Sequence, residues 1–312
     1  MTSAPILDYF PLAGRGELSR LICATAGVDI VNNNPGAKYK TKCGWFGTLP
    51  VVRHGTVTFA QSAAVQKYFS ALSQKWKLLT PQQVAVDDMF AAYLEDLLMA
   101  LFKVKNDAAS IPTVMDRYLA ALEQLVPPDG FIHGQGFPTT ADLVLFVVTH
   151  AFMPAQWILK KAKGYTWQER FPKIKGNVDR TFAVAEIQTY VRGSGTLKAG
   201  PATVFAKVIG STLCGCNSPS PISEQPPSGP ARAPSSIGTE VIELVYFPIA
   251  ARGELCRLLA AVGGVRLEVQ PPPEDQSHKK KFTGSLPQMK HGDFELTQSG
   301  AIESYIAAIA PK

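Results

Sequence analysis

Three short stretches of the sequence carry residue types that could together bind and activate a small thiol. Tyr9 lies near the end of the apolar stretch Ile6–Phe10, and a tyrosine hydroxyl that donates a hydrogen bond to a nearby sulfur favours the thiolate. A free thiol has a pKa of about 8.5, and each unit of depression corresponds to about 1.4 kcal/mol of preference for the charged form. Taken alone, such a tyrosine is more often a residue that caps a small sheet.

The other two stretches could bind a carboxylate and pair through the backbone with an extended peptide. Gln61-Ser62 begins a predicted helix, whose N-terminus presents free amides and a partial positive charge, although most serines before helices act only as caps. Leu49-Pro50 precedes a predicted strand. A cis bond there would turn the Leu49 backbone outward to pair with an extended peptide, and an ordinary turn proline is the plain alternative. Together these groups suit a small anionic thiol peptide.

The elements that would position these groups occur twice. Leu7–Val28 and Leu244–Val265 share 14 identities in 22 positions, and Gly47–Phe69 and Gly284–Ile306 share 9 in 23, both at an offset of 237 residues. A repeat of this length predicts a duplicated domain rather than a solenoid unit. The second copy keeps the residues of interest as Tyr246, Arg252, Leu286, Pro287, Gln298 and Ser299.

Each copy predicts the same order of elements. In the first copy, a strand at Ile6–Phe10 precedes a helix at Arg15–Ala26, in which apolar residues recur at helical spacing. Two strands follow, at Leu49–Val52 and Thr56–Ala60, and a helix from Gln61 through Phe69 completes the copy. The order is therefore βα followed by ββα, which places each copy in the α/β class.

An α-rich block separates the two copies. Val84–Val104, Thr113–Val126 and Phe171–Tyr190 have apolar residues at helical spacing. Thr139 stands three residues before Asp142, the pattern of a capping box, in which a hydroxyl and a carboxylate satisfy free amides at a helix N-terminus. The block is therefore predicted to be an all-α domain.

Gly193–Gly238 is rich in proline, serine and glycine, a composition typical of a linker. We predict four segments: an α/β domain at residues 1–75, an all-α domain at residues 80–195, a linker at residues 196–238 and a second α/β domain at residues 239–312. A flexible chain of about 35 residues spans about 30–35 Å, so the second copy can fold back onto the first part of the chain.

The totals limit the classes of protein. With 312 residues, 46% of them hydrophobic and 18% charged, the chain suits two or three soluble globular domains, and no apolar run approaches the ~20 residues that span a bilayer. A net charge of +6 without an arginine stripe argues against nucleic-acid binding. Five cysteines and no recognisable signal peptide predict a reducing compartment and a cytoplasmic protein.

The motifs resemble those of a known family. YFPLAGRGELSRL, followed by the Leu-Pro pair and QSAAVQKYF, resembles the N-terminal thioredoxin-like domain of cytosolic glutathione transferases of the tyrosine type, especially the sigma class. FIHGQGFPTTADL and FPKIKGNVDRTFAVAEIQTYV are similar to parts of the family's all-helical second domain. The resemblance covers about residues 5–192 and 240–312. It implies a thioredoxin-like α/β domain and an all-α domain, followed by a linker and a second thioredoxin-like domain.

The resemblance also implies roles for individual residues. Tyr9 would stabilise the glutathione thiolate as the catalytic residue. Arg15 would support the catalytic site from outside the residues that contact glutathione. Pro50 would be cis, and Asp96 would match an acidic residue that reaches the glutathione of a partner subunit. The implied glutathione-binding residues are Tyr9, Lys42, Trp45, Leu49, Pro50, Gln61, Ser62 and Asp96.

The implied activity is conjugation of the glutathione thiolate to electrophilic small molecules in detoxification, with glutathione as a substrate and no metal. Two alternatives stay open: a sigma-like, glutathione-dependent isomerase of lipid endoperoxides of the prostaglandin D synthase type, and a non-catalytic glutathione-binding or scaffold protein. The second copy is followed by no helical domain before Lys312. It is therefore expected to dock on the chain's own helical domain as an internal pseudo-dimer, or to belong to a truncated tandem transferase that forms a homodimer.

Overall fold

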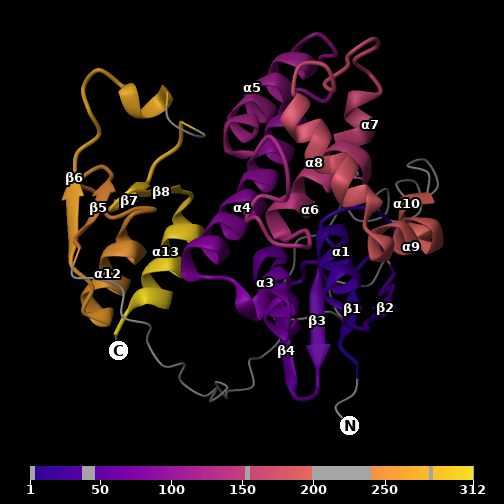
Figure 1. Cartoon of the computed structure of the whole chain (residues 1–312), viewed down its shortest axis with the longest axis horizontal. Coiled ribbons are helices and arrows are strands. Elements are labelled where there is room, and N and C mark those ends of the chain that lie inside the picture. Colours follow the sequence, from indigo (N-terminus) through magenta and orange to yellow (C-terminus); the bar gives the residue numbers. More distant parts are fainter. Residues whose placement is uncertain (1–3, 37–45, 152–154, 199–239, 281–283, 312) are drawn as a thin grey trace.

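The computed structural model describes residues 4–36, 46–151, 155–198, 240–280 and 284–311 (Figure 1). They form three units, which we call the first sheet unit (residues 4–72), the helical unit (residues 76–198) and the second sheet unit (residues 240–311). No helix within the described ranges is long and apolar enough to cross a membrane.

The first sheet unit confirms the predicted order of strands and helices and adds one strand. Its four strands lie in the order β2-β1-β3-β4, with β1 parallel to β2 and the other two pairs antiparallel. The sequence analysis missed β2, because this edge strand is short, polar and exposed, without the alternation of a half-buried strand. The elements are β1 (Ile6–Asp8), α1 (Glu17–Ala26), β2 (Val31–Asn33), β3 (Val51–His54), β4 (Val57–Ala60) and α3 (Ser62–Leu72).

The helical unit contains the helices predicted for the α-rich block. Asp142 accepts a hydrogen bond from the Thr139 backbone N–H at 2.8 Å, which confirms the capping box at the start of α6. A second capping box, with Thr80 and Gln83, begins α4. The elements are η1 (Trp76–Leu78), α4 (Pro81–Lys103), α5 (Ser110–Leu125), α6 (Thr140–Phe146), η2 (Val147–Ala151), α7 (Ala155–Leu159), α8 (Pro172–Ala183), α9 (Ala185–Gly193) and α10 (Gly195–Lys198).

The second sheet unit has the topology of the first. Its strands lie in the order β6-β5-β7-β8, with one parallel and two antiparallel pairs at the matching positions. This second four-stranded sheet suggests a second thioredoxin-like domain. The elements are β5 (Ile242–Val245), α12 (Glu254–Gly263), β6 (Leu267–Gln270), η4 (Ser277–Lys280), β7 (Gln288–His291), β8 (Phe294–Thr297) and α13 (Ser299–Ile309).

The two sheet units contact different sides of the helical unit (Figure 1). In the first sheet unit, α1 packs against α6 and α9. In the second, α13 and β8 pack against α4, and α13 lies between α4 and α12 (Figure 1). Buried apolar side chains from all three units belong to one hydrophobic cluster. The second sheet unit is therefore docked on the helical unit rather than separated from it.

Polar contacts mark the junction of the second sheet unit with the rest of the chain. The Gln298 Nε2 group donates to Asp96 Oδ2 on α4 at 2.8 Å. Lys67 on α3 forms an ion pair with Asp88 at 3.0 Å and donates to the hydroxyl of Ser304 on α13. Lys67 and Ser304 are separated by the 237-residue offset of the repeat. A contact between counterpart positions is what two-fold related copies make at their axis.

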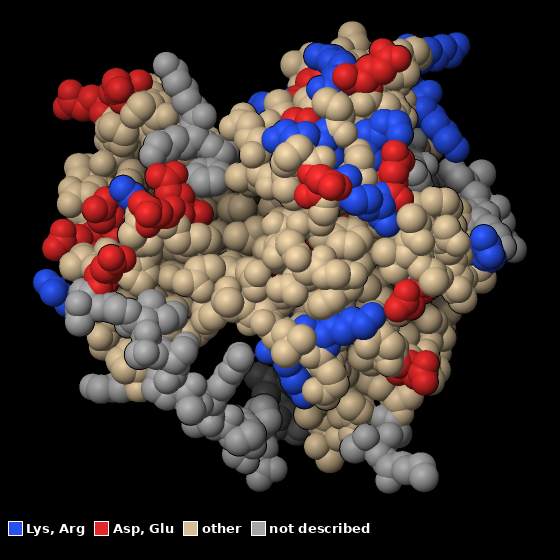
Figure 2. Space-filling view, in the orientation of Figure 1, with Lys and Arg blue, Asp and Glu red and all other residues tan. Residues whose placement is uncertain are grey.

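Charged side chains are unevenly distributed over the face in Figure 2. On the helical unit, basic and acidic groups alternate, whereas the second sheet unit, on the left of this view, carries mainly acidic groups (Figure 2). Uncharged surface lies between these two regions (Figure 2). The net charge of +6 is therefore not gathered into one basic stripe on this face.

Candidate functional site

Strand register brings three predicted site residues to one edge of the first sheet. Asp8 at the end of β1 pairs with Val51 at the start of β3, and Val51 pairs with Ala60 at the end of β4. The residues next to these three in the chain are Tyr9, Pro50 and Gln61. Because the strands are adjacent and in register, these residues lie side by side at the sheet edge that precedes α1 and α3.

Tyr9 is buried against the loop that leads into α1. Its hydroxyl oxygen accepts a hydrogen bond of 2.7 Å from the Arg15 backbone N–H. A Cβ on Gly14 would lie 2.5 Å from this hydroxyl oxygen, and one on Gly16 would lie 2.7 Å from the ring. The two glycines therefore allow the loop to wrap closely around the tyrosine.

The surroundings of Tyr9 keep its hydroxyl protonated. Burial raises the pKa of Tyr9 to about 12, although the backbone N–H of Arg15 and the guanidinium groups of Arg15 and Arg20 act in the opposite direction. Since the oxygen already accepts from Arg15, the hydroxyl hydrogen is left for another acceptor, and none is found among the described residues. Tyr9 is thus a neutral hydrogen-bond donor with a fixed oxygen.

The side chain of Arg15 contacts the helical unit and forms no hydrogen bond with Tyr9 among the described residues. Its Nε group forms an ion pair with Glu95 on α4 at 3.0 Å, and both side chains are partly exposed. Only the backbone of Arg15 contacts the tyrosine hydroxyl directly. Glu95 was missed by the sequence analysis, because nothing in the periodicity of α4 distinguishes it from other exposed acids on a helix.

The start of α3 presents backbone groups rather than a capped helix end. Gln61 is the N-cap residue and has a left-handed backbone, with φ 81°, and neither its side chain nor that of Ser62 caps the helix. The plain reading of Ser62 as a cap is therefore wrong. Left-handed backbone in a residue other than glycine is uncommon and concentrates at functional sites. The Leu49–Pro50 bond is cis, which confirms that prediction.

A buried ion pair holds the loop that follows Tyr9 in the chain. Arg20 pairs with Glu17 at 2.9 Å and donates to the backbone carbonyls of Phe10 and Leu12. The sequence analysis did not single out this pair. The identity of both residues with Glu254 and Arg257 in the second copy was the available signal.

The counterpart residues of the second sheet unit adopt the same local structure. Tyr246 accepts a hydrogen bond of 3.0 Å from the Arg252 backbone N–H, the Leu286–Pro287 bond is cis, and Gln298 has φ 73° before Ser299 begins α13. Asp96 belongs with this second set, since its carboxylate accepts from Gln298. The remaining predicted residues, Lys42 and Trp45, lie outside the described residues.

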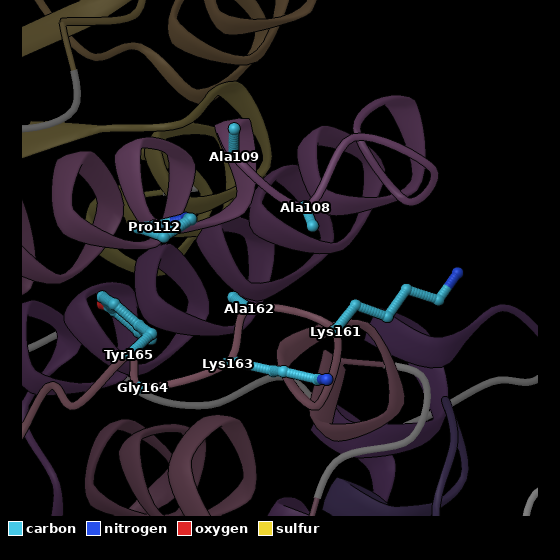
Figure 3. A pocket seen from close by; sticks show the side chains of 8 residues that line it. All are labelled: Ala108, Ala109, Pro112, Lys161, Ala162, Lys163, Gly164 and Tyr165. Carbon is cyan, nitrogen blue, oxygen red and sulfur yellow. The ribbon is translucent and has the colours of Figure 1, made fainter.

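One hollow lies apart from the residues predicted for the site. A hollow of about 470 Å³ lies between the start of α5 and the segment after α7, and Lys161, Lys163 and Tyr165 contribute to its lining (Figure 3). It includes none of the residues predicted for the site. The described part of the chain has no group of three or more His, Cys, Asp or Glu residues placed to hold a metal ion.

Comparisons with known proteins place this arrangement among glutathione S-transferases. The chain is 30% identical over 158 residues to glutathione S-transferase 1 of Ascaris suum, a match that covers 45% of this chain and 75% of the relative. It is 32% identical over 100 residues to probable glutathione S-transferase 7 of Caenorhabditis elegans, covering 29% of this chain and 47% of the relative. No family model matches the chain.

Solved structures share the fold over more than half of this chain. NaGST-2 is 20% identical, with a TM-score of 0.51, over 62% of this chain and 97% of its own. The Pi-class glutathione S-transferase of Onchocerca volvulus is 18% identical, with a TM-score of 0.50, over 63% of this chain and 96% of its own. At these identities, the likeness concerns the fold.

Proposed function

The chain belongs to the glutathione S-transferase family, and on that premise we propose that it is a tyrosine-type, sigma-like glutathione transferase that conjugates glutathione to electrophilic small molecules. The observation that carries the proposal is the alignment of Tyr9, Pro50 and Gln61 at one sheet edge. A hydrogen-bond donor for a thiol, a stretch of backbone that can pair with a peptide, and the free amides at the start of a helix are thereby adjacent. These groups match the thiol, the peptide bonds and the carboxylates of glutathione.

In this proposal, Tyr9 donates its hydroxyl hydrogen to the glutathione sulfur. The hydrogen bond favours the thiolate, so the thiol proton leaves to solvent at neutral pH. A sulfur lone pair then forms a bond to the electrophilic carbon, and the electron pair of the broken bond departs with the leaving group. Because burial keeps the pKa of Tyr9 at about 12, the tyrosine stays protonated throughout. The Arg15 backbone N–H fixes the position of the hydroxyl oxygen.

The backbone at Leu49 and the start of α3 would bind the rest of the peptide. The first amides of α3, together with the Ser62 hydroxyl and Gln61, would hold the γ-glutamyl carboxylate, since a helix N-terminus favours an anion. Leu49 would pair through its backbone with the cysteinyl unit. The second set, with Tyr246 and Gln298, would offer the same groups, and Asp96 would add an acidic side chain from α4.

We also propose that the chain is a duplicated transferase with an internal pseudo-dimer. Its domains would be residues 1–75, 80–195 and 239–312, with a linker at 196–238. The docking of α13 and β8 on α4 supports this arrangement, as does the contact between the counterparts Lys67 and Ser304. In sedimentation, a monomer is expected, whereas a stable dimer built through residues 1–192 would contradict internal docking. We propose a cytoplasmic location, because the buried thiols of Cys23 and Cys256 are free, as is usual in a reducing compartment.

Ultraviolet absorbance of the thiolate tests the function directly. Glutathione is titrated at neutral pH into the wild type, Tyr9→Phe and Tyr246→Phe. We expect a thiolate signal that Tyr9→Phe removes in large part, with any remainder coming from the second sheet unit. Binding without a thiolate signal would contradict a transferase and favour a scaffold protein. Product analysis separates the two reactions, because a conjugate contains glutathione, whereas isomerisation of a lipid endoperoxide returns it unchanged.

A further inference from the structure

The outer face of α12 is an exposed apolar stripe. Leu255, Leu258 and Val262 are 49%, 54% and 79% exposed, and their spacing of three and four residues places them on one side of the helix. Phe247 and Ile249, in the loop before α12, are also exposed. A contiguous apolar patch of this kind is unusual on a surface that contacts only water.

The first sheet unit shows what covers the same face there. The counterparts at the 237-residue offset are Leu18, Leu21 and Thr25, which are at most 1% exposed. They are buried because α6 and α9 pack against α1. The stripe on α12 thus retains the residue character of a helix–helix interface, although no described helix covers it.

The polar part of that interface is also present in both copies. In the first, Glu17 is held by Arg20 and accepts hydrogen bonds from the hydroxyls of Tyr190 at the end of α9 and Thr196 in α10. In the second, Arg257 holds Glu254 at 2.9 Å, and the Glu254 carboxylate has no hydroxyl donor within the described part of the chain.

The backbone around the second pair is already arranged for docking. Arg257 donates to the carbonyls of Phe247 and Ile249, just as Arg20 donates to those of Phe10 and Leu12. The loop, the ion pair and the apolar stripe therefore have the geometry of the covered interface before any partner is bound. A preformed surface of this kind loses little conformational entropy on binding.

We propose that the outer face of α12 is a docking site for one kind of partner, a second helical unit of the α6–α9 kind. The partner would place apolar side chains on Leu255, Leu258 and Val262, and hydroxyl groups against Glu254. A second copy of this chain does not fit, because its own α6 and α9 already cover α1. The helical unit that docks there must therefore have a free α6–α9 face.

Hydrogen exchange of the full chain tests the proposal with two probes. The first is a helix-stabilised peptide of residues 184–198, which spans α9 and α10, at concentrations up to about 1 mM. The second is an extension of residues 76–198 attached directly after Lys312, the counterpart of Lys75 at the repeat offset. The extension raises the effective concentration of the helical unit beyond what a free peptide reaches. We expect exchange in α12 to slow by about tenfold or more, with α1 as an unchanged internal reference.

Two variants distinguish specific docking on α12 from non-specific binding. Leu258→Glu places a charge in the stripe of an exposed helix, so the fold is kept and the protection of α12 should be lost. A peptide with Tyr190→Phe and Thr196→Val lacks the hydroxyl donors and should bind about threefold to tenfold more weakly. Absence of protection with both probes would overturn the proposal. Protection that persists in Leu258→Glu would overturn it as well, because the contact would then lie elsewhere.

Discussion

The two sheet units share a local structure but differ in their surroundings. Tyr9 and Tyr246 each accept a backbone N–H six residues ahead, each unit has one cis Leu-Pro bond, and Gln61 and Gln298 both have left-handed backbone. In contrast, α1 is covered by α6 and α9, whereas α12 exposes the same face. The comparison shows that local sequence determines the backbone of the site, while packing against the helical unit determines burial.

Helix α4 contacts both sheet units through two residues that are adjacent in the chain. Glu95 pairs with Arg15 of the first sheet unit, and Asp96 accepts from Gln298 of the second. Successive residues on an α-helix point about 100° apart, so adjacent acids can reach partners on different sides. A single helix of the helical unit therefore supplies an acidic group to each copy.

The largest expected difference between the copies concerns stability. Leu21→Ala removes a side chain that is fully buried between α1 and its covering helices, and truncations of this kind cost about 2–5 kcal/mol. The counterpart Leu258→Ala removes a side chain that is 54% exposed and should cost about 0.5 kcal/mol or less. Urea unfolding at equilibrium measures both. Equal losses would mean that α12 is covered in solution.

Alkaline pH should reveal the burial of Tyr9. Its pKa is about 12 in the folded chain and about 10 when unfolded, so between these values the unfolded chain releases a proton that the folded chain keeps. The contribution is complete below pH 10 and is lost as the pH rises towards 12, at about 1.4 kcal/mol per unit. Unfolding of wild type and Tyr9→Phe at several pH values measures the difference. Parallel losses in both proteins would show that Tyr9 is not the group responsible.

Much of the backbone of the site was predictable from sequence, because it depends on local residues. The cis bond at Pro50, the helix start at Ser62 and the loop around Tyr9 follow motifs that the chain contains twice. The ion pair of Arg15 with Glu95 was not predictable, since it joins residues 80 positions apart through tertiary packing. The left-handed backbone of Gln61 was also missed, because propensity disfavours it and only the surrounding fold imposes it.

A smaller effect is expected at the junction of α4 with the second sheet unit. Asp96→Ala removes the acceptor of Gln298, and a hydrogen bond to a charged group contributes about 1.5 kcal/mol, or roughly tenfold. Opening of the interface, followed by hydrogen exchange in α13, should become more frequent by up to that factor. Glu95→Ala is the matched control on the same helix, because it releases Arg15 and leaves α13 unchanged. Equal exchange in the two variants would mean that Asp96 does not hold the second sheet unit.

The smallest effect tests one of the two differences within the loop that surrounds the tyrosine, the other being Leu12 against Ile249. Gly14 has Ala251 as its counterpart, and a Cβ at position 14 would lie 2.5 Å from the Tyr9 hydroxyl oxygen and 2.7 Å from Leu12 Cδ1. In the second sheet unit, where alanine stands at this position, Tyr246 keeps the hydrogen bond at 3.0 Å, against 2.7 Å in the first, so the loop can accommodate the methyl group. Gly14→Ala should therefore keep its fold.

We expect Gly14→Ala to lower kcat/KM by about threefold to tenfold and to reduce the thiolate signal of bound glutathione in parallel, because donor position controls both. Steady-state kinetics and ultraviolet absorbance on the same samples measure the two quantities. Ala251→Gly in the second sheet unit is the matched control, and it should leave the rate unchanged if the first site dominates. If the thiolate signal falls while the rate does not, the ionised fraction does not limit the reaction, and positioning of the electrophile becomes the step to examine.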